Sequence, residues 1–216
     1  MIKDYIKLSN RAEEIDIFEE KGRVESIVEK LKKAMDSNKK LELLTAPQIG
    51  INVRIFCLRF KGDDVRFFVD PQIRHTKDLQ LFREKSVVTN KEYICPRHAS
   101  IMVSYVTPED DVKHDRFGKI EMDKFVDGTA AVFERAVNLL DGVLVEDFGL
   151  EVLPEFDKAP VEEQEQVVNC YLDNLKLNNK EAKEYIDNTP LLKSMKDKER
   201  LLVAVINGEV NLEKIK

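Results

Sequence analysis

The residue types that most often hold a catalytic metal are scarce in this sequence. Its histidines and cysteines number three each, and they are His75, His98, His114, Cys57, Cys95 and Cys170. A catalytic zinc or iron centre needs three protein ligands around an open position, and a helical His pair four residues apart is its strongest sequence sign. No two histidines have that spacing, and no two cysteines form a Cys-x-x-Cys clip. The residues therefore predict no metal site.

Other catalytic motifs are missing as well. The sequence has no Gly-x-Ser-x-Gly elbow and no Gly-x-x-x-x-Gly-Lys phosphate loop, and it has 8 glycines in all. Its adjacent carboxylates, such as Glu13-Glu14 and Glu162-Glu163, are interpreted as solvated faces, because burying neighbouring charges is costly. From the residues alone, no catalytic constellation emerges.

Composition limits the class of protein further. The 216 residues are 43% hydrophobic, which is enough for one domain of ordinary size with or without a small appendage. The net charge of −6 argues against general nucleic-acid binding, which requires a basic face. No window of 18 uncharged apolar residues predicts a membrane span, and the first residues lack the apolar stretch of a signal peptide. Three cysteines far apart in sequence suggest reduced thiols in a cytosolic setting.

Hydrophobic periodicity predicts the elements that would position any site. Apolar residues at helical spacing predict a helix over residues 23–35 that breaks at Ser37-Asn38. Residues 53–60 and 65–69 predict a hairpin, whose second strand should end at Asp70-Pro71. Two more strands are expected at residues 99–106 and 117–125, with a loop at residues 108–111 between them. Residues 130–140 are apolar around most of the helix, which predicts a buried helix with Gly142 just past its end.

The C-terminal part of the chain has a different residue pattern, which is helical throughout. Apolar and amide residues at helical spacing predict a helix whose stripe consists of Val161, Gln164, Val167, Val168, Tyr171, Leu172 and Leu175. Two shorter helices are expected at residues 180–187 and 200–206. The order of helix, strands, buried helix and further helices predicts an α+β fold, with one domain at residues 1–157 and a helical extension at residues 158–216. The stripe packs either on its own domain or on a partner, and we favour its own domain.

One segment of the chain resembles a known family. Residues 44–56 begin Leu-Thr-Ala-Pro-Gln-Ile-Gly, which is similar to the first motif of peptide deformylases, Gly-x-Gly-Leu-Ala-Ala-Pro-Gln-Ile-Gly. Residues 68–73 resemble that family's Phe-Ile-Asn-Pro-x-Ile, and residues 132–147 resemble its third motif and the strand that follows. The resemblance covers about residues 9–150 in order. It implies a deformylase-like fold, with antiparallel sheets around a buried central helix and a C-terminal helical extension.

Members of that family are metallohydrolases that remove the formyl group from N-terminal methionine. They hold their metal with a cysteine of the second motif and two histidines of a helical His-Glu-x-x-His, whose Glu is the general acid/base. The first-motif glutamine, which stabilises the oxyanion, matches Gln48, whereas the two motif glycines fall on Leu41 and Leu43. The metal-binding cysteine falls on Ser86, whose neutral hydroxyl is a poor substitute for a thiolate.

The third motif also lacks the side chains that would bind the metal and carry the proton. Gly142 anchors its register, so that the two histidines fall on Arg135 and Leu139 and the acid/base falls on Ala136. A guanidinium repels a dication, Leu139 has no lone pair, and Ala136 cannot move a proton, a role worth about 10²–10⁴-fold in rate. The resemblance thus implies the fold, while these substitutions predict no catalytic residue, no bound metal and no other cofactor. Cys95 and His98 could rebuild a metal site, but no third ligand is evident.

Without a metal, charged residues around the former metal position are expected to form ion pairs with a structural role. The second motif is placed on residues 84–88, and its glutamate is kept as Glu84, which is expected to form an ion pair with Arg97 next to the former site. Arg135 could also insert at the former metal position and pair with Glu84.

Three functional hypotheses follow. The first is a catalytically inactive protein with a structural or assembly role, with a baseplate hub component of a contractile-tailed phage as the best candidate. Its partners would be other proteins of the assembly, without nucleic acid or membrane, and it would lie in the virion or in the host cytoplasm. The second is a peptide-binding module that adds an extended peptide beside residues 41–48. The third is a deformylase-like metallohydrolase with a rebuilt site.

Overall fold

The computed structural model describes residues 1–112, 114 and 116–175. The chain divides into two compact units. Unit 1 consists of Met1–Asp78 and His98–Val143, and unit 2 consists of Leu79–Arg97 and the described part of Leu144–Lys216. The predicted division at residues 157 and 158 stays a prediction, because most of the extension lies outside the described residues.

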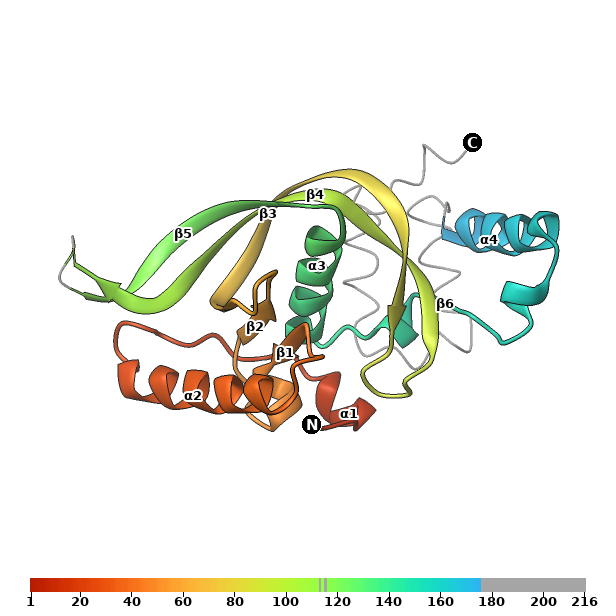
Figure 1. The fold of residues 1–216 in the computed structure, drawn as a ribbon. Helices are drawn as coiled ribbons and strands as arrows, with labels where there is room; N and C mark the ends of the chain where they lie inside the picture. The colour runs from red at the N-terminus through yellow and green to blue at the C-terminus, as the bar shows by residue number, and fades with distance from the viewer. Residues whose placement is uncertain (113, 115, 176–216) are drawn as a thin grey trace. The chain divides into compact units, whose positions relative to one another are not determined.

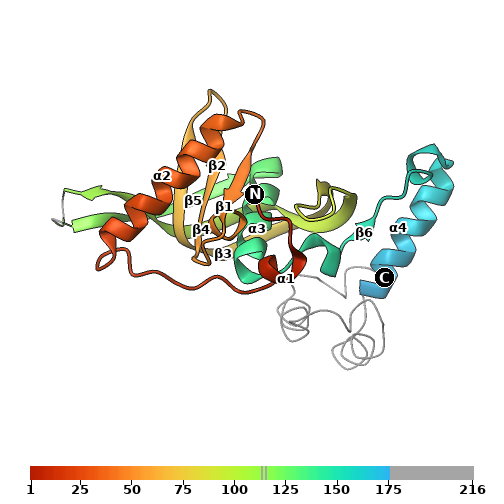
Figure 2. The same ribbon diagram turned by 90° about the horizontal axis from the view of Figure 1, so that it is seen from below.

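The first long helix of unit 1 forms as its periodicity predicts. α1 (Tyr5–Leu8) is a single turn, and α2 (Lys21–Ser37) spans the predicted helix and ends at the predicted break. The apolar stripe of α2 is fully buried and consists of Val24, Ile27, Leu31 and Met35. The stripe packs on the face of the first two strands, in one cluster with Leu44, Ile55 and Cys57, and α2 crosses these strands in Figure 2.

The strands form one antiparallel arrangement. The order is β1-β2-β3-β4-β5, made of β1 (Leu43–Thr45), β2 (Ile55–Arg59), β3 (Val65–Lys85), β4 (Glu92–Asp111) and β5 (Arg116–Val126). A short strand β6 (Leu150–Glu151) also pairs with β4. The predicted hairpin is confirmed, with Arg59 opposite Val65 at its turn.

Two predicted strand ends are wrong. β3 continues through Asp70-Pro71 for 21 residues, because Asp70 adopts a left-handed φ of 45° that bends the strand there. The Asp70 amide still donates to the Arg54 carbonyl at 2.8 Å, and Pro71, which has no amide, is accommodated at the bend. The loop predicted at residues 108–111 instead belongs to β4, whose register shifts between Thr107 and Asp110.

The predicted buried helix is α3 (Asp127–Asp141), which lies under the curved strands in Figure 1. Its Phe133 meets Phe56 and Phe68 edge to face, with ring centroids 5.0 and 5.2 Å apart. Gly142 ends the helix with a φ of 73°, as predicted. A Cβ at Gly142 would lie 2.7 Å from the Ser9 carbonyl oxygen, so this position also requires glycine for close packing.

Unit 2 contains the outer ends of β3 and β4, the short helices η2 (Val145–Asp147) and η3 (Phe156–Lys158), and α4 (Val161–Leu175). The Tyr171 hydroxyl of α4 donates to the Phe148 carbonyl at 2.9 Å, which attaches the helix to its own unit.

The predicted α4 stripe is only partly right. Gln164, Val168 and Tyr171 are half-buried, but Val161 and Val167 are exposed. The side chains of Leu172 and Leu175, and the helices predicted at residues 180–187 and 200–206, lie outside the described part of the chain.

Together the units have an α+β fold, with an antiparallel sheet around a central helix, as predicted. Of the helices that the structure describes, none combines the length and the apolar character that crossing a membrane would require.

Candidate functional site

Gln48 is held by the turn in which it lies. It belongs to the short helix η1 (Ala46–Ile49), and its Oε1 accepts hydrogen bonds from the Thr45 amide at 2.9 Å and the Thr45 hydroxyl at 3.1 Å. Gly50 ends this turn with a φ of 85°. Among the described residues, none accepts a hydrogen bond from Gln48 Nε2. The amide is therefore fixed through its oxygen and retains a donor.

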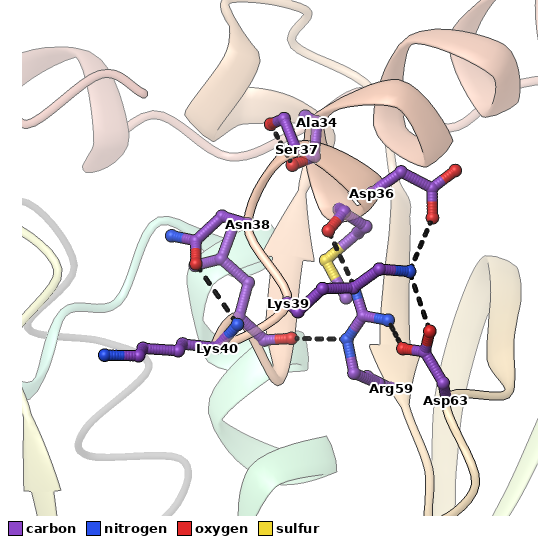
Figure 3. Close-up of polar contacts among 10 residues, drawn as sticks. Ala34, Asp36, Ser37, Asn38, Lys39, Lys40, Arg59 and Asp63 are labelled. Atoms are coloured by element: carbon purple, nitrogen blue, oxygen red, sulfur yellow. Dashed lines mark hydrogen bonds and ion pairs between the residues drawn. The ribbon is translucent and has the colours of Figure 1, made fainter.

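The segment that leads to Gln48 is fixed by a mostly buried arginine (Figure 3). Arg59 donates from Nη2 to the Met35 carbonyl at 2.7 Å and from Nε to the Leu41 carbonyl at 3.1 Å. Its charge pairs with Asp63, which also binds Lys39 Nζ at 2.7 Å. A cation at the C-terminal end of a helix satisfies its last carbonyl groups and its dipole. Arg59 thus ties the end of α2 to the entry of β1.

The two leucines at the positions predicted for the family glycines are packed. Leu41 lies against the α2 cluster, and Leu43 lies against the cluster that contains Phe133 and Ala136. Both side chains are partly buried. Their carbons fill space that glycine would leave open beside the first motif.

The α3 positions predicted for the metal ligands and the acid/base lie in or beside the apolar core. Ala136 is fully buried within the aromatic cluster, and Leu139 is 4% exposed. Arg135 is half-buried and has a polar or ring partner. Neither apolar side chain has an atom that could bind a metal or carry a proton.

Sequence reasoning missed the buried carboxylate next to these positions. Glu134 Oε2 accepts from the His98 amide at 2.7 Å, and Glu134 Oε1 lies 2.6 Å from His98 Nδ1. Both side chains are 9% exposed. The one available signal was a charged residue within an otherwise apolar helix, because a buried carboxylate requires a partner.

Ser86, in unit 2, lies in the turn after β3 and is buried. Its hydroxyl donates to Glu146 and accepts from the amides of Val88 and Thr89, both at 2.9 Å. The hydroxyl thereby ties the turn to η2. Sequence reasoning did not identify Glu146 as its partner.

Glu84 and Arg97, also in unit 2, form the expected ion pair. Arg97 Nη2 donates to Glu84 Oε1 at 3.1 Å and Nε donates to Oε2 at 3.2 Å, and the side chains are 5% and 9% exposed. The guanidinium also lies over the Phe148 ring, 5.2 Å from its centroid. A two-pronged pair of this kind satisfies both charges away from water. The contact predicted between Glu84 and Arg135 stays a prediction.

The residues at the positions predicted for the family's metal ligands do not fit a metal. They supply a hydroxyl already in use, a guanidinium and an alkyl group, whereas Zn²⁺ requires thiolate, imidazole or carboxylate donors. No three His, Cys, Asp or Glu side chains in the described ranges group closely enough to hold a metal ion. Of the alternative ligands, Cys95 is fully buried and His98 Nδ1 is engaged by Glu134.

Comparison with known proteins identifies the fold. A model of the polypeptide deformylase family matches residues 3–148. No curated protein matches the chain. A probable peptide deformylase from Synechococcus phage S-SSM7 is 23% identical, with 67% of this chain and 93% of that chain covered and a TM-score of 0.55.

Two bacterial enzymes are similar to the same extent. The peptide deformylase from Thermotoga maritima is 21% identical, with 68% of this chain and 92% of that chain covered and a TM-score of 0.54. The enzyme from Synechococcus elongatus, in complex with actinonin, is 19% identical, with 72% and 80% covered and a TM-score of 0.56. These structural likenesses establish the fold.

Proposed function

Since the chain belongs to the polypeptide deformylase family, we propose that it keeps the fold without the hydrolytic activity and has a structural or assembly role. The observation that carries this proposal is the burial of Ala136 and Leu139 at the positions of the acid/base and of one metal ligand. A fold and the site that it carries can be lost or kept separately.

The chemistry of formyl hydrolysis explains why this observation matters. Water must be activated and a proton must reach the leaving amine, and a positioned acid/base contributes about 10²–10⁴-fold to such a step. Ala136 offers no group for either transfer. Ser86, at the position of the metal-binding thiolate, already uses its hydroxyl with Glu146 and two backbone amides.

Within a structural role, the best candidate is a hub component of the baseplate of a contractile-tailed phage. This step depends on the resemblance of the sequence to degenerate deformylase-like hub proteins. It is compatible with the deformylase of a Synechococcus phage among the structural neighbours. Other proteins of the assembly would be the partners, and the chain would lie in the virion or in the host cytoplasm.

A hydrolysis assay tests the loss of activity. The purified chain is supplied with Zn²⁺, Fe²⁺ or Ni²⁺ in turn and incubated with a formyl-Met-Ala-Ser peptide, and the free amine is measured. An active bacterial deformylase serves as the positive control. We expect no release above the rate without protein. Metal-dependent release by the wild-type chain, lost on Gln48→Ala, would overturn the proposal.

The assembly role has its own test. The tagged chain is purified from its native source, and the proteins that co-purify in a fixed ratio are identified by mass spectrometry. Tail or baseplate proteins would support the hub, whereas ribosomes and nascent-chain factors, or the chain alone, would contradict it.

Peptide binding is a second candidate, and one observation favours it. Gln48 keeps its amide nitrogen as a donor at the end of β1, the strand beside which a peptide would add. Calorimetry with a Met-Ala-Ser peptide tests it, with Gln48→Ala as the matched variant. Binding that this substitution weakens would favour the module, and no heat of binding would exclude it.

A further inference from the structure

The sheet of unit 1 ends in a strand with a free edge. β5 is the last strand in the order and pairs on one side with β4, with Ile101 opposite Phe125 and Ser104 opposite Met122. In the part of the chain that the structure describes, no backbone group bonds to the other side of β5. The unpaired amide and carbonyl groups of such an edge offer a template for another strand. β5 borders the sheet in Figure 1.

Most side chains along the central part of β5 alternate between apolar and charged. On one face Ile120, Met122 and Val126 are 58%, 60% and 49% exposed. Lys124 lies on the same face, between Met122 and Val126, and the alternate positions carry the charged Lys119, Glu121 and Asp123 and the buried Phe125. Successive side chains of a strand point to opposite faces, so the apolar groups form a stripe on one face of the sheet.

We propose that β5 is a self-association surface, on which two copies of the chain pair their β5 strands antiparallel about a two-fold axis and continue one sheet. The axis passes through Glu121, the middle residue of β5. The whole strand then pairs with its copy. Ile120 lies opposite the partner's Met122, and Lys119 lies opposite the partner's Asp123.

The charges select this register. A two-fold axis normal to the sheet places residues of the same face opposite one another, so the axis must pass through a residue. An axis at Met122 puts Glu121 opposite the partner's Asp123. An axis at Ile120 pairs Lys119 with the partner's Glu121 but also puts Arg116 opposite the partner's Lys124. Like charges directly opposite each other destabilise a sheet. An axis at Glu121 instead forms two Lys–Asp pairs and places Lys124 opposite a glycine, the partner's Gly118.

Asp123 has an oxygen available for this contact. Arg66 Nη2 and the Tyr105 hydroxyl both donate to its Oδ2, at 2.7 and 2.6 Å. Its Oδ1 accepts no hydrogen bond from the described residues. Glu121 is the unfavourable position, since it faces its own copy, and its ion pair with Lys119 reduces that repulsion. The surface lies outside the candidate site, so it does not depend on whether the chain is catalytic.

Sedimentation velocity at a series of concentrations tests the association. We expect a monomer–dimer equilibrium for the wild-type chain. Ile120→Lys/Met122→Lys should abolish the dimer without changing the melting temperature, because both side chains are mostly exposed in the monomer. Glu121→Gln should strengthen the dimer several-fold, because it removes two facing charges. A monomer at every concentration, or a dimer that the lysine variant leaves intact, would overturn the proposal.

Cross-linking tests the register. In a Cys170→Ser background, which removes the exposed cysteine, Glu121→Cys places two thiols on the axis. The Cα atoms of directly opposed residues are about 4.5–5.5 Å apart, which a disulfide spans. Lys124→Cys is the matched control, since its copies lie six residues or about 20 Å apart. A disulfide-linked dimer for Glu121→Cys alone supports the register, and cross-linking through position 124 or through neither position contradicts it.

Discussion

The two segments that resemble the deformylase site motifs have opposite surroundings. On α3 in unit 1, the positions predicted for the acid/base and for one ligand carry Ala136 and Leu139, buried carbon side chains. In unit 2, Glu84 near the end of β3 has a buried ion pair, and Ser86 in the turn that follows has three hydrogen bonds. The α3 positions are apolar and buried, and the unit 2 positions form a polar network.

The difference follows from what surrounds each segment. α3 is covered by the aromatic cluster of Phe56, Phe68 and Phe133, where an uncompensated charge is costly and an alkyl group gains burial energy. The turn residues lie beside backbone amides that need acceptors, so a hydroxyl at position 86 is useful there without any metal. Stability therefore explains the residues at both places.

The largest effect is expected from Ala136→Glu, which introduces the acid/base that the family resemblance predicts at this position. It buries an unpaired carboxylate in a packed core and should lower the free energy of unfolding by about 4–5 kcal/mol. Urea denaturation followed by circular dichroism measures the loss. Thr129→Glu, at an exposed position in the first turn of the same helix, is the control and should be neutral or slightly stabilising. A stable Ala136→Glu variant would show that the position is not apolar core.

Glu84→Ala should cause the next largest loss of stability. It leaves the buried Arg97 guanidinium without its carboxylate, at a cost of about 3 kcal/mol. The double variant Glu84→Leu/Arg97→Met, which removes both charges, should recover most of that loss. Lys91→Ala, which breaks an exposed pair with Glu151 in the same unit, should leave the melting temperature unchanged. Equal effects of the single and double variants would argue against a paired role.

Ser86→Ala should have a smaller effect, about 1–2 kcal/mol, because the amides of Val88 and Thr89 lose an acceptor and Glu146 loses a donor. Thermal unfolding measures it. Ser37→Ala, which removes an exposed hydroxyl that bonds only to a helical carbonyl, is the control. An unchanged melting temperature for Ser86→Ala would mean that the turn does not depend on its hydroxyl.

The smallest expected effect is a gain in stability that depends on pH and comes from replacing Asp70. Burial raises the pKa of Asp70 to about 6, although the Ile15 amide and Arg54 act in the opposite direction. The unfolded pKa is near 3.9, so the folded state binds more protons between about pH 4 and 6, and stability falls as the pH rises through this range.

Asp70→Asn removes that loss and keeps a residue that tolerates the left-handed φ. After allowance for partial exposure, the gain at pH 7.5 is about 1 kcal/mol, or a melting temperature about 2–4 °C higher. The gain should vanish at pH 4. Melting curves at both pH values measure it, and an equal gain at both would exclude titration of Asp70 as its cause.

Local sequence patterns predicted the helices and the hairpin that form from residues close together in the chain. The stripe of α2, the β2–β3 hairpin and the buried helix α3 with its Gly142 cap are confirmed because each combines periodicity with a turn or cap residue. The continuation of β3 was missed because Asp-Pro normally ends a strand. At the bend, the Asp70 amide donates to the carbonyl of Arg54, a residue distant in sequence that directly precedes β2.

Of the partners near the candidate site, the sequence predicted the Glu84–Arg97 pair and missed two others. The resemblance to the deformylase motifs places the site at Gln48, Ser86, Arg135, Ala136 and Leu139, and this placement stays a prediction. The bonds from Ser86 to Glu146 and from His98 to Glu134 join residues 60 and 36 positions apart. Neither periodicity nor spacing encodes such contacts, because they arise when strands and helices from distant segments pack.

Metal binding tests the central claim most directly. The chain, freed of metal with a chelator and dialysed, is titrated with Co²⁺, whose absorption reports thiolate and imidazole ligands. Ser86→Cys/Arg135→His/Leu139→His, which restores the family's ligand types, is compared under the same conditions. We predict no absorption change and no bound metal for the wild-type chain. A wild-type chain that binds one equivalent of Co²⁺, with Cys95 or His98 required for binding, would contradict the account.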